Sequence, residues 1–273
     1  MDNNTFFTII LAIRNVGEDL KTSIENYSKQ TYKNFELIIA DCNSEDNPIQ
    51  FINNNHFPIK HIIQNDNGIY DAWNKVLPIA QGEWIIFMGA GDVFYNDNVL
   101  ENSAKELEQL SQKIKIAYGQ IDIIGENNQV IGAAGIPWDE YMSKISKLCM
   151  FPHQATFQRK KSFEEFGLFD TNYKIAGDFE MILRVGMQQK PHFFYAKIAK
   201  FQFGGTSSTI SNREKMIIEW HFIMKKYNLK HQFAKQFFKA KIINLSLKLF
   251  NTKNINNLID LYRILIRKKR RYN

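Results

Sequence analysis

The chain has 273 residues, of which 44% are hydrophobic and two are cysteines, and its formal net charge is +7. This length and apolar content suffice for a sizeable core, and the pair Cys42 and Cys149 gives no disulfide framework. No stretch approaches the ~20 apolar residues of a transmembrane helix, and the polar first residues do not resemble a secretory signal. We therefore expect one globular domain followed by a tail, in a reducing cytoplasm.

Strands and helices are predicted to alternate along the first half of the chain. Apolar runs predict strands at Phe6–Ile13, Phe35–Ala40 and Ile59–Gln64. Between the first two, Glu18–Gln30 carries apolar residues at helical spacing. This order is typical of an α/β fold that binds nucleotides.

The stretch Asp66–Phe94 reads DNGIYDAWNKVLPIAQGEWIIFMGAGDVF and is the most informative part of the sequence. Trp84–Met88 is continuously apolar, which predicts a strand buried on both faces. Ligands collect at the carboxyl ends of such strands, where Gly91 allows close backbone approach and Asp92 offers a carboxylate. Asp92 is therefore a candidate ligand for Mg²⁺ or Mn²⁺. Its alternative role is to cap a helix predicted at Val99–Leu110.

The same stretch resembles the family 2 glycosyltransferases, in which a D-x-G-x-x-x-A-x-N-K helix precedes G-[DE]-x-[IL]-x-F-[LM] and an acidic loop. The matching positions are Asp66, Gly68, Ala72, Asn74, Lys75, Gly82, Glu83, Trp84, Ile86, Phe87, Met88 and Asp92. The resemblance implies an inverting hexosyltransferase with the GT-A type α/β fold, a mixed and mostly parallel sheet flanked by helices. It also implies a nucleotide-sugar donor and a divalent cation, Mn²⁺ or Mg²⁺.

The acidic loop departs from the family pattern. The family usually has Asp-x-Asp-Asp there, whereas this chain has Gly89 and Gly91 and keeps only Asp92. With one protein carboxylate, the donor diphosphate would have to supply much of the coordination of the cation.

Further donor contacts follow from the resemblance. The segment ADCNSED matches a family D-x-x-S-x-D in which the first Asp, here Asp41, bonds the base and Ser44 and Asp46 shape the loop; an ordinary turn is the alternative. The resemblance also assigns to the donor side Ala12, Arg14, Asn15, Asp66, Gly68, Asn74, Lys75 and Gly91. Arg14 replaces a more usual aromatic residue, and its guanidinium suits stacking on the base or contact with a phosphate. Lys75 is equally explained as a solvated charge.

The second half contains a segment expected to carry the catalytic base. Residues 167–184 read GLFDTNYKIAGDFEMILR and resemble the family's G-x-F-D-x-x-[FY] followed by [ED]-D-x-[DE]-x-x-L-R. The resemblance makes Asp178 the general base, with Gly177 where many relatives have Glu. Asp178 equally suits an N-cap of a helix Phe179–Met187. Glu180 is the alternative base, but it should point elsewhere and pair with Arg184 four residues on.

The segment HQATF places His153 and Gln154 as candidates for the acceptor side, although His153 is equally explained as a hydrogen-bonded polar residue. The other histidines, His56, His61, His192, His221 and His231, show no metal-ligand spacing. Phe203–Thr209 is a Gly/Ser/Thr loop, either one that closes over the substrates or a plain linker.

The tail is strongly basic. Residues 225–273 contain 14 Lys and Arg against Asp260 alone, a charge of +13, so residues 1–224 carry −6. Apolar and basic residues alternate in two approximate amphipathic helices, after which Arg267–Arg271 is continuously basic. This pattern favours an anionic membrane surface. The alternatives are helices packed on the domain and an arm for nucleic acid, which we do not expect because no nucleic-acid motif accompanies the tail.

We therefore expect a GT-A domain at residues 1–210, with a donor half to about 118 and an acceptor half after it, and a helical tail at 211–273. The expected activity is sugar transfer from a nucleotide-sugar, with uridine as the expected base, to a saccharide or lipid-linked saccharide at the cytoplasmic face of the membrane. Surface polysaccharide or lipopolysaccharide synthesis is the expected pathway. One alternative is a non-catalytic nucleotide-sugar-binding or membrane-surface scaffold. Another, a nucleotidyltransferase, would need a Gly-rich phosphate loop near the first strand, where Gly17 stands alone.

Overall fold

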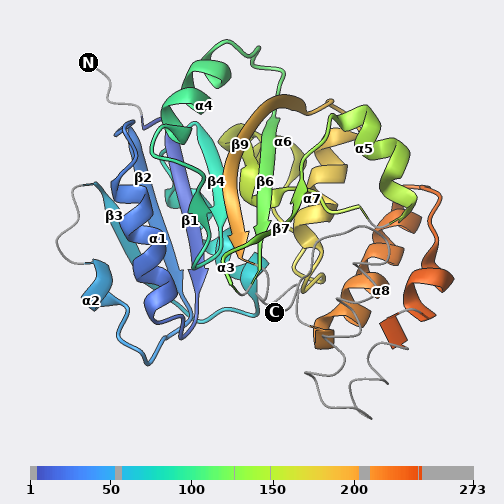
Figure 1. Cartoon of the computed structure of the whole chain (residues 1–273), viewed down its shortest axis with the longest axis horizontal. Coiled ribbons are helices and arrows are strands. Elements are labelled where there is room, and N and C mark those ends of the chain that lie inside the picture. Colours follow the sequence, from blue (N-terminus) through green and yellow to red (C-terminus); the bar gives the residue numbers. More distant parts are fainter. Residues whose placement is uncertain are drawn as a thin grey trace.

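The computed structural model describes residues 5–52, 57–125, 127–147, 149–202, 210–238 and 240–241. Their strands form one nine-stranded sheet in the order β3-β2-β1-β4-β8-β6-β9-β5, with β7 paired to β6. Helices cover both faces, and α8 lies beside α7 at the far end from β3 (Figure 1).

The first half of the chain contains, in order, β1 (Phe7–Ile13), α1 (Glu18–Ser28), β2 (Phe35–Asp41), α2 (Ile49–Ile52), β3 (Ile59–Ile63), α3 (Ile69–Val76), the 3-10 helix η1 (Leu77–Ile79), β4 (Trp84–Met88), β5 (Val93–Phe94) and α4 (Val99–Glu108). The strands and helices predicted with bounds in this half are present, and their ends differ from the prediction by at most two residues.

The second half contains, in order, β6 (Ile116–Ile124), β7 (Val130–Ala134), α5 (Trp138–Lys144), the 3-10 helices η2 (Ile145–Lys147) and η3 (His153–Ala155), β8 (Thr156–Arg159), α6 (Lys160–Phe166), α7 (Gly177–Gly186), β9 (His192–Gln202) and α8 (Ile210–Lys226). Strands β1 to β4 pair in parallel. β8 then joins antiparallel to both β4 and β6, whereas β9 runs parallel to β6. The expected mixed α/β fold is confirmed, and parallel pairing prevails in its first half.

The sheet separates two hydrophobic cores. All five residues of β4 are buried. Trp84, Ile86 and Met88 face a core shared with α1 and α4, whereas Ile85 and Phe87 face a second core with α3, α7 and α8. This alternation follows from the two-residue period of a strand, and it explains why β4 reads as continuously apolar.

Gly82, which precedes β4, has a packing role. A Cβ atom at this position would clash with the backbone nitrogen of Thr8 in β1. The amide of Gly82 donates to Thr8 Oγ1 (2.8 Å), and that hydroxyl donates to the buried carboxylate of Glu36 (2.7 Å). The glycine of the G-[DE] motif thus allows β4 to enter the sheet next to β1.

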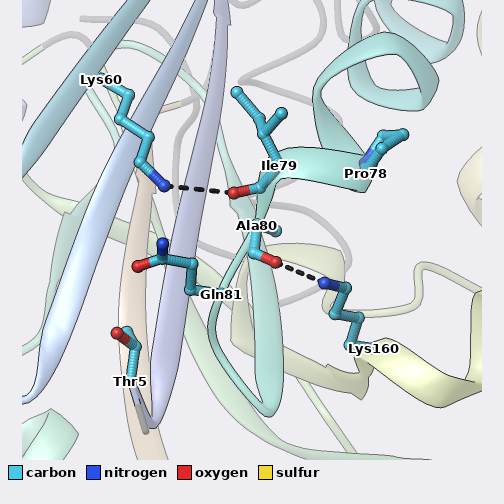
Figure 2. A pocket seen from close by; sticks show the side chains of 7 residues that line it. All are labelled: Thr5, Lys60, Pro78, Ile79, Ala80, Gln81 and Lys160. Atoms are coloured by element: carbon cyan, nitrogen blue, oxygen red, sulfur yellow. Dashed lines mark hydrogen bonds between the residues drawn. The ribbon is translucent and has the colours of Figure 1, made fainter. Parts of the chain in front are cut away.

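A cavity of about 810 Å³ lies at the amino-terminal edge of the sheet (Figure 2). Its lining residues are Thr5, Lys60, Pro78, Ile79, Ala80, Gln81 and Lys160. The ammonium groups of Lys60 and Lys160 donate to the carbonyl oxygens of Ile79 (3.1 Å) and Ala80 (2.5 Å). Thr5 and Gln81 precede β1 and β4, so this cavity opens at the edge opposite to Asp41 and Asp92.

The start of the predicted tail is part of the domain core. Ile217, Trp220, Ile223 and Met224 of α8 are buried against α3 and α7. Residues 233–238 are helical, as predicted for this part of the tail. Apart from residues 240–241, the remainder of the predicted tail helices lies outside the described residues, as do Arg267–Arg271 and the loop Phe203–Thr209. Within the described ranges, no helix combines the length and apolar character needed to cross a bilayer.

Candidate active site

Three neighbouring strands end at the same edge of the sheet. Ile13 at the end of β1 is in register with Asp41 of β2, and Leu11 of β1 is in register with Met88 of β4. Arg14, Asp41 and the loop 89–92 therefore leave adjacent strands side by side. This is the edge of an open α/β sheet at which ligands bind.

Asp41 is held from two sides. Its carboxylate is almost fully buried, with 1% of the residue exposed. Oδ1 accepts a hydrogen bond from the amide of Ser44 (2.9 Å), and Oδ2 lies 2.8 Å from Nε2 of His61 in β3. The interaction with His61 fixes the carboxylate at the carboxyl end of β2, the position expected for a contact with the donor base.

The loops after β1 and β2 are tied together. The amide of Asn15 donates to Ser44 Oγ (3.0 Å), and the amide of Gly17 donates to Asp46 Oδ2 (2.6 Å). Asn15 has φ of +51°, a left-handed conformation that asparagine tolerates, and its side chain accepts from Glu45 N (2.8 Å). Ser44 and Asp46 shape the loop as expected, and Asn15 is one of the residues that join the two loops.

Arg14 is exposed on the donor edge. It forms no hydrogen bond or ion pair with another described residue. Ala12, two residues earlier in β1, is half-buried. An exposed guanidinium at this edge can bind an anionic phosphate or stack on a base.

The residues predicted on α3 divide into two groups. At its start Gly68 has φ of +119° and donates to Asp66 Oδ1 (3.0 Å). This turn follows β3, whose last residue Ile63 is in register with Asp41, so it lies at the same edge. Lys75 lies near the other end of the helix, where its ammonium bonds Asp71 (2.9 Å) and the carbonyl of Asn65 (2.7 Å). The structure thus gives Lys75 protein partners within the donor half.

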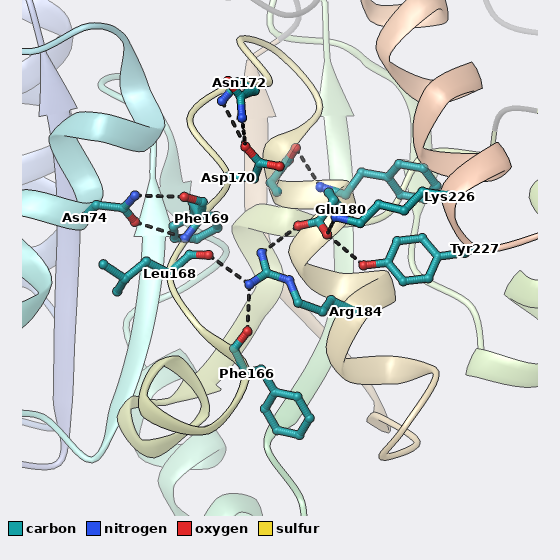
Figure 3. Close-up of polar contacts among 12 residues, drawn as sticks. Asn74, Phe166, Leu168, Phe169, Asp170, Asn172, Glu180, Arg184, Lys226 and Tyr227 are labelled. Atoms are coloured by element: carbon teal, nitrogen blue, oxygen red, sulfur yellow. Dashed lines mark hydrogen bonds and ion pairs between the residues drawn. The ribbon is translucent and has the colours of Figure 1, made fainter.

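Asn74 connects the two halves of the domain (Figure 3). Its Nδ2 donates to the carbonyl of Phe169 (2.9 Å), and its Oδ1 accepts from the amide of Phe169 (3.0 Å). Both ends of the amide are therefore engaged, which favours a positioning role over the predicted contact with the donor.

Asp92 turns inward. Only 5% of the residue is exposed, and Oδ2 accepts from Gly89 N (2.8 Å). Burial raises the pKa of this carboxyl to about 7, although hydrogen bonds from the backbone of Gly89 and Gln202 and from the side chain of Gln154 act in the opposite direction. Asp92 does not cap α4, because the N-cap there is Asn98.

The loop around Asp92 does not fit a cation held by the protein. A Cβ at Gly89 would lie 2.9 Å from Asp92 Oδ2, and Gly91 has φ of +88°. Both glycines are thus built into the turn rather than open to replacement by carboxylates. Among the described residues, no group of three or more His, Cys, Asp or Glu side chains is placed to hold a metal ion.

Asp178 lies at the start of α7 and faces Tyr70 of α3. The phenol oxygen lies 3.0 Å from Asp178 Oδ1, which also accepts from Phe179 N (2.8 Å). The N-cap of α7 is Ala176, so the alternative role of Asp178 as N-cap is wrong; it lies in the first turn. A Cβ at Gly177 would lie 2.8 Å from the Tyr70 ring, which explains the glycine at this position.

Glu180 is excluded as the base by its surroundings. It is fully buried, and it bonds Arg184 (2.6 Å), Lys226 (2.8 Å) and the hydroxyl of Tyr227 (2.7 Å) (Figure 3). Burial alone would raise its pKa, but these three donors hold the pKa below the ordinary value. The predicted pairing with Arg184 is confirmed.

His153 is buried among aromatic side chains. Its ring stacks on Trp73, with 5.4 Å between ring centroids, and on Phe87, with 5.8 Å. Burial lowers the pKa of His153, partly offset by the charge of Asp178. Its Nε2 is buried and has no hydrogen-bond partner among the described residues. The neighbouring Gln154 bonds Asp92, whereas His153 is affected by Asp178 only through its charge.

Two side chains of the site were not predicted from the sequence. His61, which contacts Asp41, has no metal-ligand spacing, and a single histidine in an apolar strand gives no signal of its role. Tyr70, which contacts Asp178, stands two residues after Gly68 within the recognised motif. Tyr70 belongs to the motif, but the sequence gives no sign of its contact with Asp178, which lies more than a hundred residues away.

A family model described as Glycosyl transferase family 2 matches residues 8–168, more than half of the chain. The chain belongs to glycosyl transferase family 2. A PGL/p-HBAD biosynthesis glycosyltransferase of Mycobacterium bovis is 27% identical over 215 residues, which cover 76% of this chain and 81% of that protein. An uncharacterised glycosyltransferase of Rickettsia typhi is 23% identical over 239 residues, 83% of this chain and 74% of that protein.

Solved structures of glycosyltransferases share the fold of this family 2 member. Staphylococcus aureus TarS (residues 1–349, with UDP) superposes with a TM-score of 0.61 at 14% identity over 93% of this chain and 78% of TarS. A mannosyltransferase of Pyrobaculum calidifontis, solved with GDP-mannose and Mn²⁺, gives 0.63 at 13% identity over 95% and 79%. At these identities the likeness shows the GT-A fold alone.

Proposed function

We propose that this family 2 glycosyltransferase is an inverting, hexosyl-transferring enzyme that moves a sugar from a uridine-diphosphate sugar to a hydroxyl of a saccharide or lipid-linked saccharide. The contact between Tyr70 and Asp178 (3.0 Å) carries the proposal, because it joins the helix after the donor edge to the helix with the expected base. TarS binds UDP and UDP-GlcNAc on the same fold, which supports a uridine donor.

On the donor side, the proposal gives separate roles to Asp41 and Arg14. Asp41, fixed by His61, accepts a hydrogen bond from the base. Arg14 meets the diphosphate, since its guanidinium forms bidentate contacts with phosphate oxygens. Gly68 and Gly91, both with positive φ, allow the donor to approach the backbone.

In the transfer step, Asp178 takes the proton of the acceptor hydroxyl. The acceptor oxygen then attacks the anomeric carbon on the face opposite the departing nucleoside diphosphate, which inverts the configuration. General-base assistance of this kind contributes roughly 10²- to 10⁴-fold in rate. His153 and Gln154 border the acceptor in this arrangement. The proposed transfer step uses no metal ion, because the residues around Asp92 do not fit one.

The acceptor side of the proposal draws on the tail and on the relatives. A basic tail suits an anionic leaflet, and the Mycobacterium bovis relative belongs to PGL/p-HBAD biosynthesis. We place this enzyme at the cytoplasmic face of the membrane, attached peripherally through residues 225–273, in surface polysaccharide or lipopolysaccharide synthesis. Binding of the full chain to vesicles with and without phosphatidylglycerol checks this placement.

The activity is tested by donor hydrolysis and transfer with UDP-, GDP- and dTDP-sugars in Mn²⁺, Mg²⁺ or EDTA. Turnover of one UDP-sugar that is lost in Asp178→Asn is the expected result. Nucleotide binding without turnover of any donor would instead support a non-catalytic, nucleotide-sugar-binding protein. Full activity in EDTA would show that no divalent cation is needed.

A further inference from the structure

Residues 174–176, directly before α7, are bound by a carboxylate from α8. The amide of Lys174 donates to Glu219 Oε1 (2.8 Å), and the amides of Ile175 and Ala176 donate to Oε2 (2.9 and 2.8 Å). The first amides of a helix and those just before it lack intrahelical partners. No side chain within this segment caps α7, so Glu219 satisfies these donors with a negative charge at the positive end of the helix.

The opposite side of the same segment contacts Tyr70. The phenol donates to the carbonyl of Ile175 (2.7 Å) and lies 3.0 Å from Asp178 Oδ1. The ring packs directly on the backbone, because only a glycine fits at position 177. Burial and the charge of Asp178 hold the pKa of Tyr70 well above its ordinary value, so the hydroxyl keeps its proton.

A second contact fixes α8 along α7. Lys226 and Tyr227 bond the buried Glu180, one turn after the segment that Glu219 holds (Figure 3). Glu219 and Lys226 are seven residues apart, which corresponds to about two helical turns and places them on one face of α8. The two contacts thus join α8 to α7 at two points along one face.

We infer that Glu219 and Tyr70 clamp residues 174–176 from opposite sides and thereby position Asp178 for proton abstraction. The inference rests on the proposed role of Asp178 as the base. Neither clamp residue is assigned a contact with substrate; both are positioning residues. A segment at the start of the predicted tail therefore supplies part of the machinery of the acceptor half.

On the Tyr70 side, the clamp also contacts Asp178 itself. Its ring and hydroxyl contact both the backbone before α7 and Asp178 Oδ1, so its loss should misplace the carboxylate. A misplaced Asp178 should lower kcat and leave donor binding unchanged. A general disturbance of the fold would instead weaken both.

The test uses the full-length chain and the variants Glu219→Gln and Tyr70→Phe. Glu164→Gln and Tyr195→Phe are matched controls, because both residues are exposed and neither side chain has a hydrogen bond or ion pair within the described part of the chain. Urea unfolding shows that each variant folds, and calorimetric titration with UDP measures donor-side binding. Transfer kinetics use the donor that the panel selects.

We expect Glu219→Gln to lower kcat roughly 10- to 100-fold, because a small misplacement of a catalytic group has effects of this size. The KM for the donor and the Kd for UDP should stay within twofold of the wild type. Tyr70→Phe should likewise lower kcat and leave the Kd for UDP within twofold of the wild type. Both controls should behave like the wild type.

Two results would overturn the inference. One is a kcat within twofold of the wild type for both variants while Asp178→Asn is inactive. The other is an equal loss of UDP binding and kcat, which indicates a general disturbance of the fold. If Glu219→Gln does not fold, Tyr70→Phe decides through its kcat and its Kd for UDP. Wild-type activity in Asp178→Asn would instead refute the proposed function on which the clamp depends.

Discussion

The loop 89–92 and the start of α7 each place an aspartate at the candidate site, but the two carboxylates differ in exposure and in hydrogen bonding. Asp92 bends back onto Gly89 and is nearly inaccessible. Asp178 is only partly buried and is contacted through Oδ1, while its Oδ2 makes no hydrogen bond with another described residue. Asp92 is thus used within its own loop, whereas Asp178 keeps one carboxylate oxygen available for chemistry.

Asp178→Asn should have the largest effect, a loss of activity, and it tests directly whether Asp178 is the reactive carboxylate. The amide cannot accept the proton, so kcat should fall roughly 10²- to 10⁴-fold. UDP binding, measured by calorimetry, should be unchanged because Asp178 lies on the acceptor side. Asp139→Asn, at an exposed carboxylate paired with Lys190, is the matched control. A fall of less than tenfold would remove Asp178 from the role of base.

The sequence predicted the first half of the fold and the position of Asp178, because both depend on local signals. Apolar runs and helical spacing set the bounds of β1 to β4, and the motif around Asp178 is contiguous. The clamp at residues 174–176 was not predictable, because Glu219 appears in the sequence as one charge among many in a segment assigned to a basic tail. The inward direction of Asp92 also depends on distant partners, Gln154 and Gln202, that no spacing reveals.

Glu180→Ala should have the next largest effect, on stability. Loss of the buried carboxylate leaves Arg184 and Lys226 without their partner, but both can reach solvent, with 20% and 46% of their side chains exposed. We expect the free energy of unfolding in urea to fall by about 2–4 kcal/mol, near the lower end for a broken buried pair. Glu164→Gln should change it by less than about 0.5 kcal/mol. An equal change in both variants would show that the network contributes no special stability.

Asp41→Asn should weaken donor binding while leaving the acceptor side intact. Replacement of a charged acceptor by a neutral amide costs about 1.5–3 kcal/mol, which corresponds to a roughly 10- to 100-fold increase in the Kd for UDP. Asp71→Asn is the control, because Asp71 pairs with Lys75 on α3. An unchanged Kd for UDP would show that the uracil base of the donor binds elsewhere on this edge of the sheet.

Asp92→Asn tests the other side of the comparison through the pH dependence of stability. The pKa of Asp92 is raised from its ordinary value to about 7. The folded state therefore holds this proton more tightly than the unfolded state, and the resulting stability is present at low pH and is lost as pH rises toward 7. The slope reaches at most about 1.4 kcal/mol per pH unit. Asparagine does not titrate, so we expect the wild type to lose about 2 kcal/mol relative to the variant between pH 5 and pH 7.

Urea unfolding at the two pH values, with and without Mn²⁺, measures this difference, and Asp139→Asn controls for an exposed carboxylate. The same experiment separates a structural Asp92 from a metal ligand. A cation ligand must be ionised, and a cation that binds only the folded protein raises its stability. Parallel pH curves for wild type and Asp92→Asn, together with stabilisation of the wild type alone by Mn²⁺, would assign Asp92 to a cation after all. If the stability curves of wild type and Asp92→Asn diverge with pH and Mn²⁺ changes neither, Asp92 serves to close its own loop. Arg14 would then be the residue that meets the charge of the diphosphate.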